Sequence, residues 1–230
     1  MSEPVQRRIR SFVRRQGRMT QAQQSALERW WDQYVIAPAG VLDLDVLFKR
    51  AAPRVLEIGF GMGDSLAAMA LAHPERDYLG IEVHRPGVGR LLGQLEAQGA
   101  GNVRVMCADA VEMLQRHVPD AGIDTVQLFF PDPWPKKRHH KRRIVQTEFV
   151  ELLSRKLKAG GIFHVATDWE HYAEHVLAVM AQVPGFRNSA GTARYTKRPN
   201  DRPPTKFEQR GERLGHVIRD LIFVREIPGG

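Results

Sequence analysis

The sequence predicts an α/β fold, with a mostly parallel β-sheet covered by helices on both faces. Short apolar segments alternate with amphipathic segments between residues 53 and 182, which is typical of such a sheet. The first apolar segment runs into a turn with three glycines, from Gly59 to Gly63. A last apolar segment at 217–224 follows a polar loop at about 191–214, and no helix comes after it. We therefore expect this last segment to close the sheet as an antiparallel strand.

The expected elements follow one another in order along the chain. A helix over about 20–35 is predicted by the capping-box pattern of Thr20 and Gln23 and by apolar residues at helical spacing up to Tyr34. We expect its tryptophans to pack in the core. The pair Gly160-Gly161 is expected to stop a helix at 146–158. Strands are expected near 53–58, 78–83, 103–107, 123–130 and 161–167, and the other helices near 63–73, 86–99, 110–117 and 169–182.

The chain has 230 residues, of which 43% are hydrophobic, enough for one domain with a sizeable core. We expect a basic N-terminal arm and helix over 1–50 and the main domain over 51–230. No run of about eighteen apolar residues occurs, so no membrane span is expected. Cys107 is the lone cysteine, which excludes an intramolecular disulfide and a cysteine-based zinc cluster and fits a reducing cytoplasm.

Positive charge is concentrated in two segments. Residues 1–20 hold six arginines and one acid, and residues 136–143 hold six lysines and arginines. The formal net charge is +8, so the rest of the chain is slightly acidic. Two basic segments on such a body indicate a polyanionic partner. Residues 1–19 contain few apolar side chains, and we expect them to form a mobile arm.

The glycine turn predicts a ligand site at the end of the first strand. Gly59, Gly61 and Gly63 are spaced Gly-x-Gly-x-Gly, whereas dinucleotide-binding turns have Gly-x-Gly-x-x-Gly. The carboxylate of Glu57, just before the turn, would repel a pyrophosphate but would suit an amino group, such as that of S-adenosylmethionine. The spacing therefore favours a methyl donor over NAD. A glycine-rich turn that binds nothing is the alternative at this point.

Two further apolar segments also end in an acid. Glu82 follows Gly63 by about the twenty residues that place a carboxylate on ribose hydroxyls in such folds. Asp109 follows the next segment and could lie beside the adenine or simply cap the helix that comes after it. Because the carboxyl ends of parallel strands meet at one edge of the sheet, we expect these acids to lie close together.

The segment after the fourth strand predicts a pocket for a nucleobase. Three prolines, from Pro131 to Pro135, fix the backbone around Asp132 and Trp134. A planar base could stack on Trp134 or Phe130 while Asp132 accepts hydrogen bonds from it. The basic run that follows could grip phosphates. A proline-rich turn around a buried aromatic ring is the structural alternative.

Together these segments resemble the tRNA (guanine-N7-)-methyltransferase family in its bacterial single-chain form. The proline-rich run with its basic tail and the Thr-Lys-Phe-Glu run are the most specific features. The glycine turn is shared by many methyltransferases. The matching stretches are Glu57–Gly63, Gly80–Glu82, Phe130–His139 with Lys141–Arg143, Ala166–Asp168 and Thr205–Glu208.

The resemblance implies a seven-stranded S-adenosylmethionine-dependent methyltransferase (Rossmann-like) fold that methylates N7 of a guanosine in the variable loop of tRNA. It implies Asp132 as the catalytic residue. It also implies that S-adenosylmethionine lies against Glu57, Gly59, Gly61, Gly63, Glu82, Asp109 and Asp132. The substrate contacts it implies are Lys136, Asp168, Thr205, Lys206, Phe207 and Glu208, and the RNA contacts are Arg138, His139, His140, Lys141, Arg142 and Arg143. We expect no metal, no obligate protein partner and a monomer. Asp168 could instead cap the helix that follows it.

The chemistry of guanine N7 leaves the role of Asp132 open between two possibilities. N7 has a free lone pair and no proton to lose, so its methylation requires no strong base. Positive charge moves onto the purine in the transition state, and a fixed carboxylate would stabilise it and orient the base. Proton abstraction from N1 is the second role.

Four rival interpretations have features of their own. His171, Glu174 and His175 form a His-x-x-Glu-His pattern seen in some zinc peptidases, although so loose a pattern often occurs by chance. A methyltransferase acting on the amino group of adenine would carry a similar loop after the fourth strand. An RNA-binding module without turnover is the non-enzymatic alternative. The glycine spacing and the basic run argue against an NAD dehydrogenase.

Overall fold

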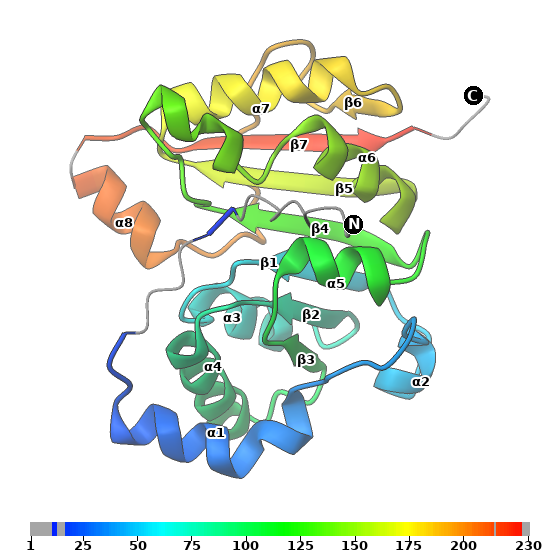
Figure 1. Cartoon of the computed structure of the whole chain (residues 1–230), viewed down its shortest axis with the longest axis vertical. Helices are drawn as coiled ribbons and strands as arrows, with labels where there is room; N and C mark the ends of the chain where they lie inside the picture. The colour runs from blue at the N-terminus through cyan, green and yellow to red at the C-terminus, as the bar shows by residue number, and fades with distance from the viewer. Residues whose placement is uncertain (1–10, 13–16, 214, 227–230) are drawn as a thin grey trace, which may run out of the picture.

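The fold was obtained as a computed structural model that describes residues 11–12, 17–213 and 215–226. A single seven-stranded sheet crosses the molecule, in the order β3-β2-β1-β4-β5-β7-β6 (Figure 1). Most of the arm expected to be mobile, residues 1–10 and 13–16, lies outside the described residues. No helix in the described part of the chain is long and apolar enough to cross a membrane.

The strands confirm the predicted arrangement of the sheet. The first five strands pair in parallel, and β7 runs antiparallel between β5 and β6. The predicted antiparallel strand therefore exists, but the short β6, which we did not predict, forms the edge. The bounds are β1 Arg54–Ile58, β2 Asp77–Ile81, β3 Val103–Met106, β4 Ile123–Phe129, β5 Leu157–Thr167, β6 Phe186–Asn188 and β7 Arg219–Arg225.

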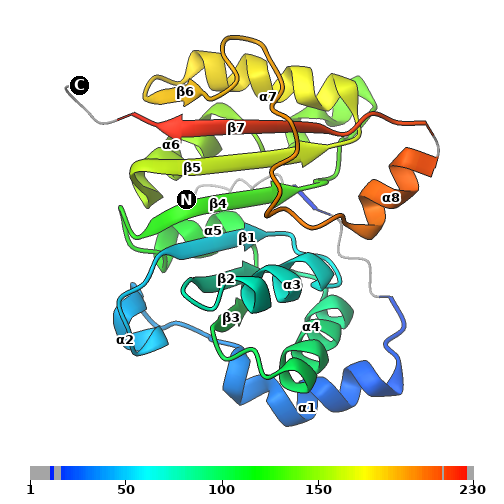
Figure 2. The same ribbon diagram turned by 180° about the vertical axis from the view of Figure 1, so that it is seen from behind.

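Helices cover both faces of the sheet (Figures 1 and 2). One buried apolar cluster takes side chains from α5, α6 and α7, and a second takes side chains from α1, α3 and α4. The bounds are α1 Gln21–Tyr34, α2 Leu44–Phe48, α3 Asp64–Ala72, α4 Arg85–Gln98, α5 Ala110–Arg116, α6 Thr147–Lys156, α7 Glu170–Gln182, α8 Lys206–Arg213 and the 3₁₀ helix η1 Lys137–Arg142.

The first helix begins at the predicted capping box. Thr20 Oγ1 accepts a hydrogen bond from the amide of Gln23, whose side chain accepts one from the amide of Thr20. Its two tryptophans are partly buried against the core, as expected. The helix packs on α4, and the next residues reach the edge of the sheet, where the Ile36 amide donates to the carbonyl oxygen of Val105. A division at residue 50 stays a prediction.

The role predicted for Gly160-Gly161 is wrong. Helix α6 ends at Lys156, and both glycines lie inside β5. A Cβ at Gly161 would lie 2.8 Å from the carbonyl oxygen of Lys158 and 3.1 Å from that of Asp124. Gly161 therefore allows close backbone approach within the strand, Gly160 adopts a positive φ of +76°, and neither glycine ends the helix.

The segment predicted as a polar loop at 191–214 contains a helix, α8. Thr205 Oγ1 accepts from the Glu208 amide at 3.1 Å, and the Thr205 amide lies 3.4 Å from Glu208 Oε2. This is the reciprocal bonding of a capping box, and its Thr-x-x-Glu pattern is visible in the sequence. Helix α8 lies beyond the carboxyl ends of β4 and β5 (Figures 1 and 2).

Candidate active site

The carboxyl end of β1 presents a buried carboxylate without a full set of partners. Glu57 is 2% exposed, and its Oε2 has no hydrogen-bond partner among the residues that the structure describes. Burial, helped by the negative charge of Glu82, raises the pKa of the Glu57 carboxyl to about 8. A buried acceptor of this kind is costly unless a ligand pairs with it, and an ammonium group is the partner that suits it best.

The glycine turn after β1 has two different uses. Gly59 and Gly61 have φ values of +72° and +59°, and a Cβ at either would meet no heavy atom of the described part of the chain within 4 Å. Their backbone therefore faces open space, which a ligand can approach closely. A Cβ at Gly63 would lie 2.7 Å from Cβ of Leu91 in α4, so this third glycine allows the turn to pack against a helix.

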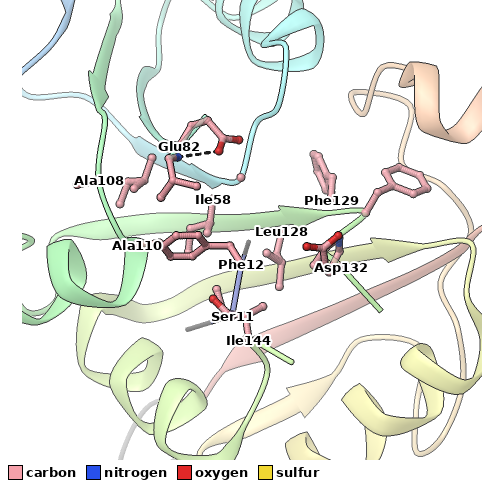
Figure 3. Close-up of a pocket in the computed structure, with 15 residues that line it drawn as sticks. Ser11, Phe12, Ile58, Glu82, Ala108, Ala110, Leu128, Phe129, Asp132 and Ile144 are labelled. Atoms are coloured by element: carbon pink, nitrogen blue, oxygen red, sulfur yellow. Dashed lines mark hydrogen bonds between the residues drawn. The ribbon is translucent and has the colours of Figure 1, made fainter. Parts of the chain in front are cut away.

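Glu82 ties the glycine turn to the end of β2. Its carboxylate accepts hydrogen bonds from the amides of Gly61 at 2.8 Å, Val83 at 2.7 Å and His84 at 2.9 Å; the bond to Val83 is visible in Figure 3. The two carboxylate oxygens together have about four acceptor positions, so capacity is left for a ligand hydroxyl.

Asp109 caps the helix that follows it, which was one of the two alternatives. Its Oδ1 accepts from the amides of Val111 at 2.9 Å and Glu112 at 3.3 Å at the start of α5. Its neighbours Ala108 and Ala110 line the pocket described below. A contact between Asp109 and adenine stays a prediction.

Ile58 and Gly59, where β1 meets the glycine turn, and Glu82 after β2 line one end of a cavity of about 220 Å³, whereas Glu57 and Asp109 are not part of its lining. Asp132 lies at the other side of the cavity, after β4, with Leu128 beside it (Figure 3). Ser11 and Phe12 of the N-terminal arm also line it, which could not be expected from the local sequence pattern. The buried oxygen of Glu57 and the open backbone of the turn fit the chemistry of S-adenosylmethionine, which carries an amino group.

The proline-rich loop holds Asp132 between two strained residues. Phe130 and Trp134 both have positive φ, at +50° and +46°, which is uncommon for residues other than glycine. Such strain persists only where the surrounding structure imposes it, and it is frequent at functional sites. Asp132 itself is exposed, so its carboxylate is free to meet a substrate.

The aromatic ring of Trp134 is already engaged by protein groups. The guanidinium of Arg142 lies 5.0 Å from the ring centroid, and the ring of His139 contacts it edge-on at 5.8 Å. Trp134 Nε1 donates to the carbonyl oxygen of Ser11 at 3.2 Å, which connects the arm to the loop. Of the two rings proposed for base stacking, Phe130 is the one that lines the pocket.

The basic run folds into η1 and divides into exposed and buried parts. Lys136, Arg138 and Lys141 are exposed, whereas His139, His140 and Arg142 are partly covered. Desolvation and the neighbouring cations lower the pKa of His139. Arg143 is 2% exposed, donates through Nε to the carbonyl oxygen of Pro133 at 3.0 Å and lies over the ring of Tyr172. Arg143, expected among the RNA contacts, thus supports the proline-rich loop from inside.

The other expected substrate residues lie at the ends of β5 and α8. Asp168 follows β5 and lies 3.2 Å from His216 Nδ1; no side chain caps α7, so Asp168 does not act as its cap. Thr205 precedes α8 and is partly exposed, whereas Glu208 is 1% exposed and bonded to other residues of the chain. The side chains of Lys206 and Phe207 lie outside the described part of the structure.

The His-x-x-Glu-His pattern lies on α7. His175 donates through Nε2 to the carbonyl oxygen of Val145 at 2.8 Å, and His171 contacts the ring of His140. Among the residues that the structure describes, no three His, Cys, Asp or Glu side chains are grouped so that they could hold a metal ion.

Solved methyltransferases share this fold. A 16S rRNA methyltransferase, KamB, superimposes with a TM-score of 0.58 at 15% identity, covering 81% of this chain and 95% of that chain. A 16S rRNA (adenine(1408)-N(1))-methyltransferase from Catenulisporales acidiphilia, solved with S-adenosylmethionine, gives a TM-score of 0.54 at 17% identity, covering 82% and 94%.

Similarity in sequence is much closer to another group of methyltransferases. Residues 51–221 match a family model described as "Putative methyltransferase". A tRNA (guanine-N(7)-)-methyltransferase of Edwardsiella ictaluri is 60% identical over 95% of this chain and 92% of that protein. Those of Sodalis glossinidius and Yersinia enterocolitica are 59% and 57% identical, each over 96% of this chain, covering 93% and 92% of those proteins. The chain therefore belongs to the tRNA (guanine-N(7)-)-methyltransferase family.

Proposed function

We propose that this protein transfers a methyl group from S-adenosylmethionine to N7 of a guanosine in the variable loop of tRNA. The observation that carries this proposal is the position of Asp132, held on a strained, proline-rich loop at the edge of the pocket. The carboxylate of Glu82 lies on the opposite side of that pocket, and the exposed cations of η1 follow the loop. The high identity to tRNA (guanine-N(7)-)-methyltransferases supports the choice of tRNA and of N7.

The residues at the ends of β1 and β2 would hold the cofactor. S-adenosylmethionine supplies a methyl group on a sulfonium centre, which is open to in-line attack. Glu57 would pair with its amino group, because Oε2 is buried and accepts no hydrogen bond from the described residues of the chain. Glu82 would accept from the ribose while it keeps Gly61 in place. Gly59, Gly61 and Gly63 shape the turn that the cofactor approaches, and Asp109 lies beside the adenine end.

Asp132 would act on the guanine. Its exposed carboxylate can accept hydrogen bonds from N1–H and the exocyclic amine, which turns N7 toward the pocket. Positive charge that develops on the purine is then stabilised by a carboxylate already in place, at no reorganisation cost. Alignment of N7 with the methyl group supplies a further part of the acceleration.

The surroundings of Asp132 would bind the rest of the nucleotide and the RNA. Lys136, Asp168 and Thr205 stand around the loop at the carboxyl edge and would contact the guanosine, with Lys206, Phe207 and Glu208 as part of the same segment. The exposed cations Arg138 and Lys141 would contact phosphates, together with the partly covered His139, His140 and Arg142. We further propose a monomer that works in the cytoplasm, where its tRNA substrate is found.

Product identification tests this proposal. The protein is incubated with S-adenosylmethionine labelled in the methyl group and with unmodified tRNA transcripts, and the digested RNA is separated into nucleosides. We expect the label in 7-methylguanosine, within the variable-loop fragment. Label in a methylated adenosine would overturn the choice of base and atom, and tRNA binding without any label would indicate an RNA-binding protein.

A further inference from the structure

A buried arginine, Arg202, lies at the centre of a charged network behind the substrate side of the pocket. Its side chain is 1% exposed. Two of its nitrogens donate to the two carboxylate oxygens of Glu208, at 2.6 and 3.0 Å. It also contacts both oxygens of Asp220, at 2.8 and 3.0 Å. The guanidinium is thus shared by two carboxylates that are themselves 2% exposed.

Each carboxylate of the network connects Arg202 to a different part of the fold. Glu208 belongs to the capping box that starts α8 with Thr205. Asp220 lies in β7, and its Oδ1 accepts from Nε2 of His164 in the neighbouring β5 at 2.7 Å. The start of α8 is therefore bonded through one guanidinium to two strands of the sheet.

The same guanidinium also contacts a residue that lines the pocket, Phe129. It lies 5.7 Å from the centroid of the Phe129 ring, and Phe129 is in turn packed edge-on against His164 at 5.0 Å. Phe129 is the last residue of β4 and directly precedes the strained Phe130 and the loop that carries Asp132. Arg202 therefore contacts both segments that are proposed to hold the guanosine.

We propose that Arg202 is a positioning residue for methyl transfer, which sets the place of Thr205 and the start of α8 relative to Phe129 and the Asp132 loop. The inference rests on the proposed function. It also gives Glu208 an indirect role, through Arg202 and the helix cap. The Glu208 carboxylate accepts hydrogen bonds from Arg198 and Arg202.

The chemistry of the network explains why an arginine stands here. A planar guanidinium can pair with one carboxylate through two parallel bonds and still reach a second, whereas an ammonium is a single point of charge. Burial acts to raise the pKa of Glu208, but the hydrogen bonds and charge of Arg202 outweigh it and lower that pKa. Glu208 thus stays ionised and bonded. A misplacement of about 1 Å can cost a reaction about a hundredfold in rate.

The conservative variant Arg202→Lys tests the proposal. Lysine keeps the charge but loses the paired geometry, so α8 and the Phe129 side of the pocket are no longer held in register. We expect kcat with tRNA to fall by about ten- to hundredfold. The Kd for S-adenosylmethionine should stay within about twofold, because the cofactor carboxylates lie elsewhere. Glu208→Gln, which breaks the same pair from the other side, should show the same pattern.

Arg54→Lys is the matched control for a loss of stability. Arg54 is also a buried arginine, 3% exposed, and pairs with the buried Asp77 at 2.7 Å, but it stands at the amino end of β1. We expect Arg54→Lys to lower Tm and to leave kcat unchanged at temperatures well below Tm. A wild-type kcat in Arg202→Lys, or equal losses of kcat in Arg202→Lys and Arg54→Lys at matched Tm, would overturn the proposal.

Hydrogen exchange separates this inference from the proposed function. Amides at 205–213 should exchange faster in Arg202→Lys than in the wild type, and those of α1 should not change. Wild-type protein that makes no 7-methylguanosine would contradict the proposed function, whatever the exchange result. Unchanged protection at 205–213 in Arg202→Lys would contradict the inference even if the wild type is active.

Discussion

Three carboxylates near the carboxyl ends of β1, β2 and β4 differ in burial and bonding, and these differences set what each can do. Glu57 is buried with one oxygen unpaired, so it can bind a cation strongly. Glu82 is held by three backbone amides and keeps the turn in shape. Asp132 is exposed on a rigid loop, so it is available to the base. Distinct environments thus give the carboxylate group three different roles, a pattern common in active sites.

Replacement of Asp132 tests its role in catalysis. Asp132→Asn keeps the shape but loses the charge that would stabilise the methylated purine, so we expect kcat to fall by about 10²–10³-fold. Affinity for S-adenosylmethionine should change little. Single-turnover rates with tRNA measure the effect, and Glu112→Gln, on the surface of α5, serves as a control. Near-full turnover in Asp132→Asn would exclude the electrostatic role.

Glu57 makes the stability of the free protein depend on pH. Its folded-state pKa is raised to about 8, whereas a glutamate in an unfolded chain titrates near about 4.3. Between these values the folded protein holds a proton that the unfolded chain has released, so stability falls as pH rises through this window. Glu57→Gln cannot titrate, and its Tm should exceed that of the wild type at pH 8.5 and match it at pH 5.

Thermal unfolding without cofactor, measured from pH 5 to pH 9, tests this difference. Each kcal/mol by which Glu57→Gln raises the free energy of unfolding above that of the wild type should raise Tm by about 2–4 °C in a protein of this size. A Tm difference between Glu57→Gln and wild type that does not grow with pH would show that the carboxyl titrates normally.

The same variant tests the contact with the amino group of the cofactor. A hydrogen bond to a charged group contributes about 1.5–3 kcal/mol, so Glu57→Gln should weaken S-adenosylmethionine binding by about ten- to hundredfold. Methylthioadenosine, which lacks the amino-acid part, is the matched ligand, and its affinity should hardly change. Equal losses for both ligands in calorimetry would mean that Glu57 acts only on the shape of the pocket.

At the scale of the elements, η1 presents cations next to the pocket. Replacement of Lys137, Arg138 and Lys141 by alanine should lower tRNA affinity by about ten- to hundredfold and reduce the slope of log K against log salt by about two. Exposed Arg116 and Arg155, at the ends of α5 and α6, provide the control pair. Filter binding over a salt series measures tRNA affinity in both sets of variants. Equal losses of tRNA affinity in the two sets would contradict the assignment.

Local patterns made most of the elements predictable, and most errors came where tertiary structure decides. Glu57 near the end of β1, and Glu82 and Asp109 after β2 and β3, stand at the ends of clear apolar segments, so both the strands and the common position of their carboxyl ends could be inferred. Helix α8 was missed although Thr205 and Glu208 form a capping box, because the segment around them is polar and lacks an apolar stripe. Strand β6 has three residues and depends on pairing with β7, which no local pattern reveals.

The candidate site was predictable in its residue types but not in which side chains face outward. Arg143 lies in the same basic run as Arg138, yet it turns inward to the carbonyl oxygen of Pro133. Glu208 lies in a polar segment, yet its side chain is buried in a pair with Arg202. Phe12 reaches the pocket from the far end of the sequence. These placements depend on contacts between distant segments, which composition and spacing do not record.

At the scale of the whole molecule, the carboxyl ends and the amino ends of the parallel strands have different functions. The glycine turn, Asp132, η1 and α8 lie at the carboxyl ends of the strands. Structural ion pairs, such as that of Arg54 with Asp77, lie at the amino ends. Because the protein has a formal net charge of +8, its binding of tRNA should depend steeply on salt concentration, whereas its binding of S-adenosylmethionine should not. Parallel titrations at about 50 and 200 mM salt measure both, and a flat response for tRNA would exclude phosphate contacts as its main source of affinity.

The most direct test of the account is a transfer assay with a tRNA whose variable-loop guanosines are replaced by 7-deazaguanosine. This base keeps N1–H and the exocyclic amine for Asp132 but has a carbon in place of N7. We predict rapid labelling of the unmodified tRNA and none of the 7-deaza tRNA, with similar binding of both. Equal labelling of the two RNAs would show that the methyl group goes to another atom or another loop and would contradict the account.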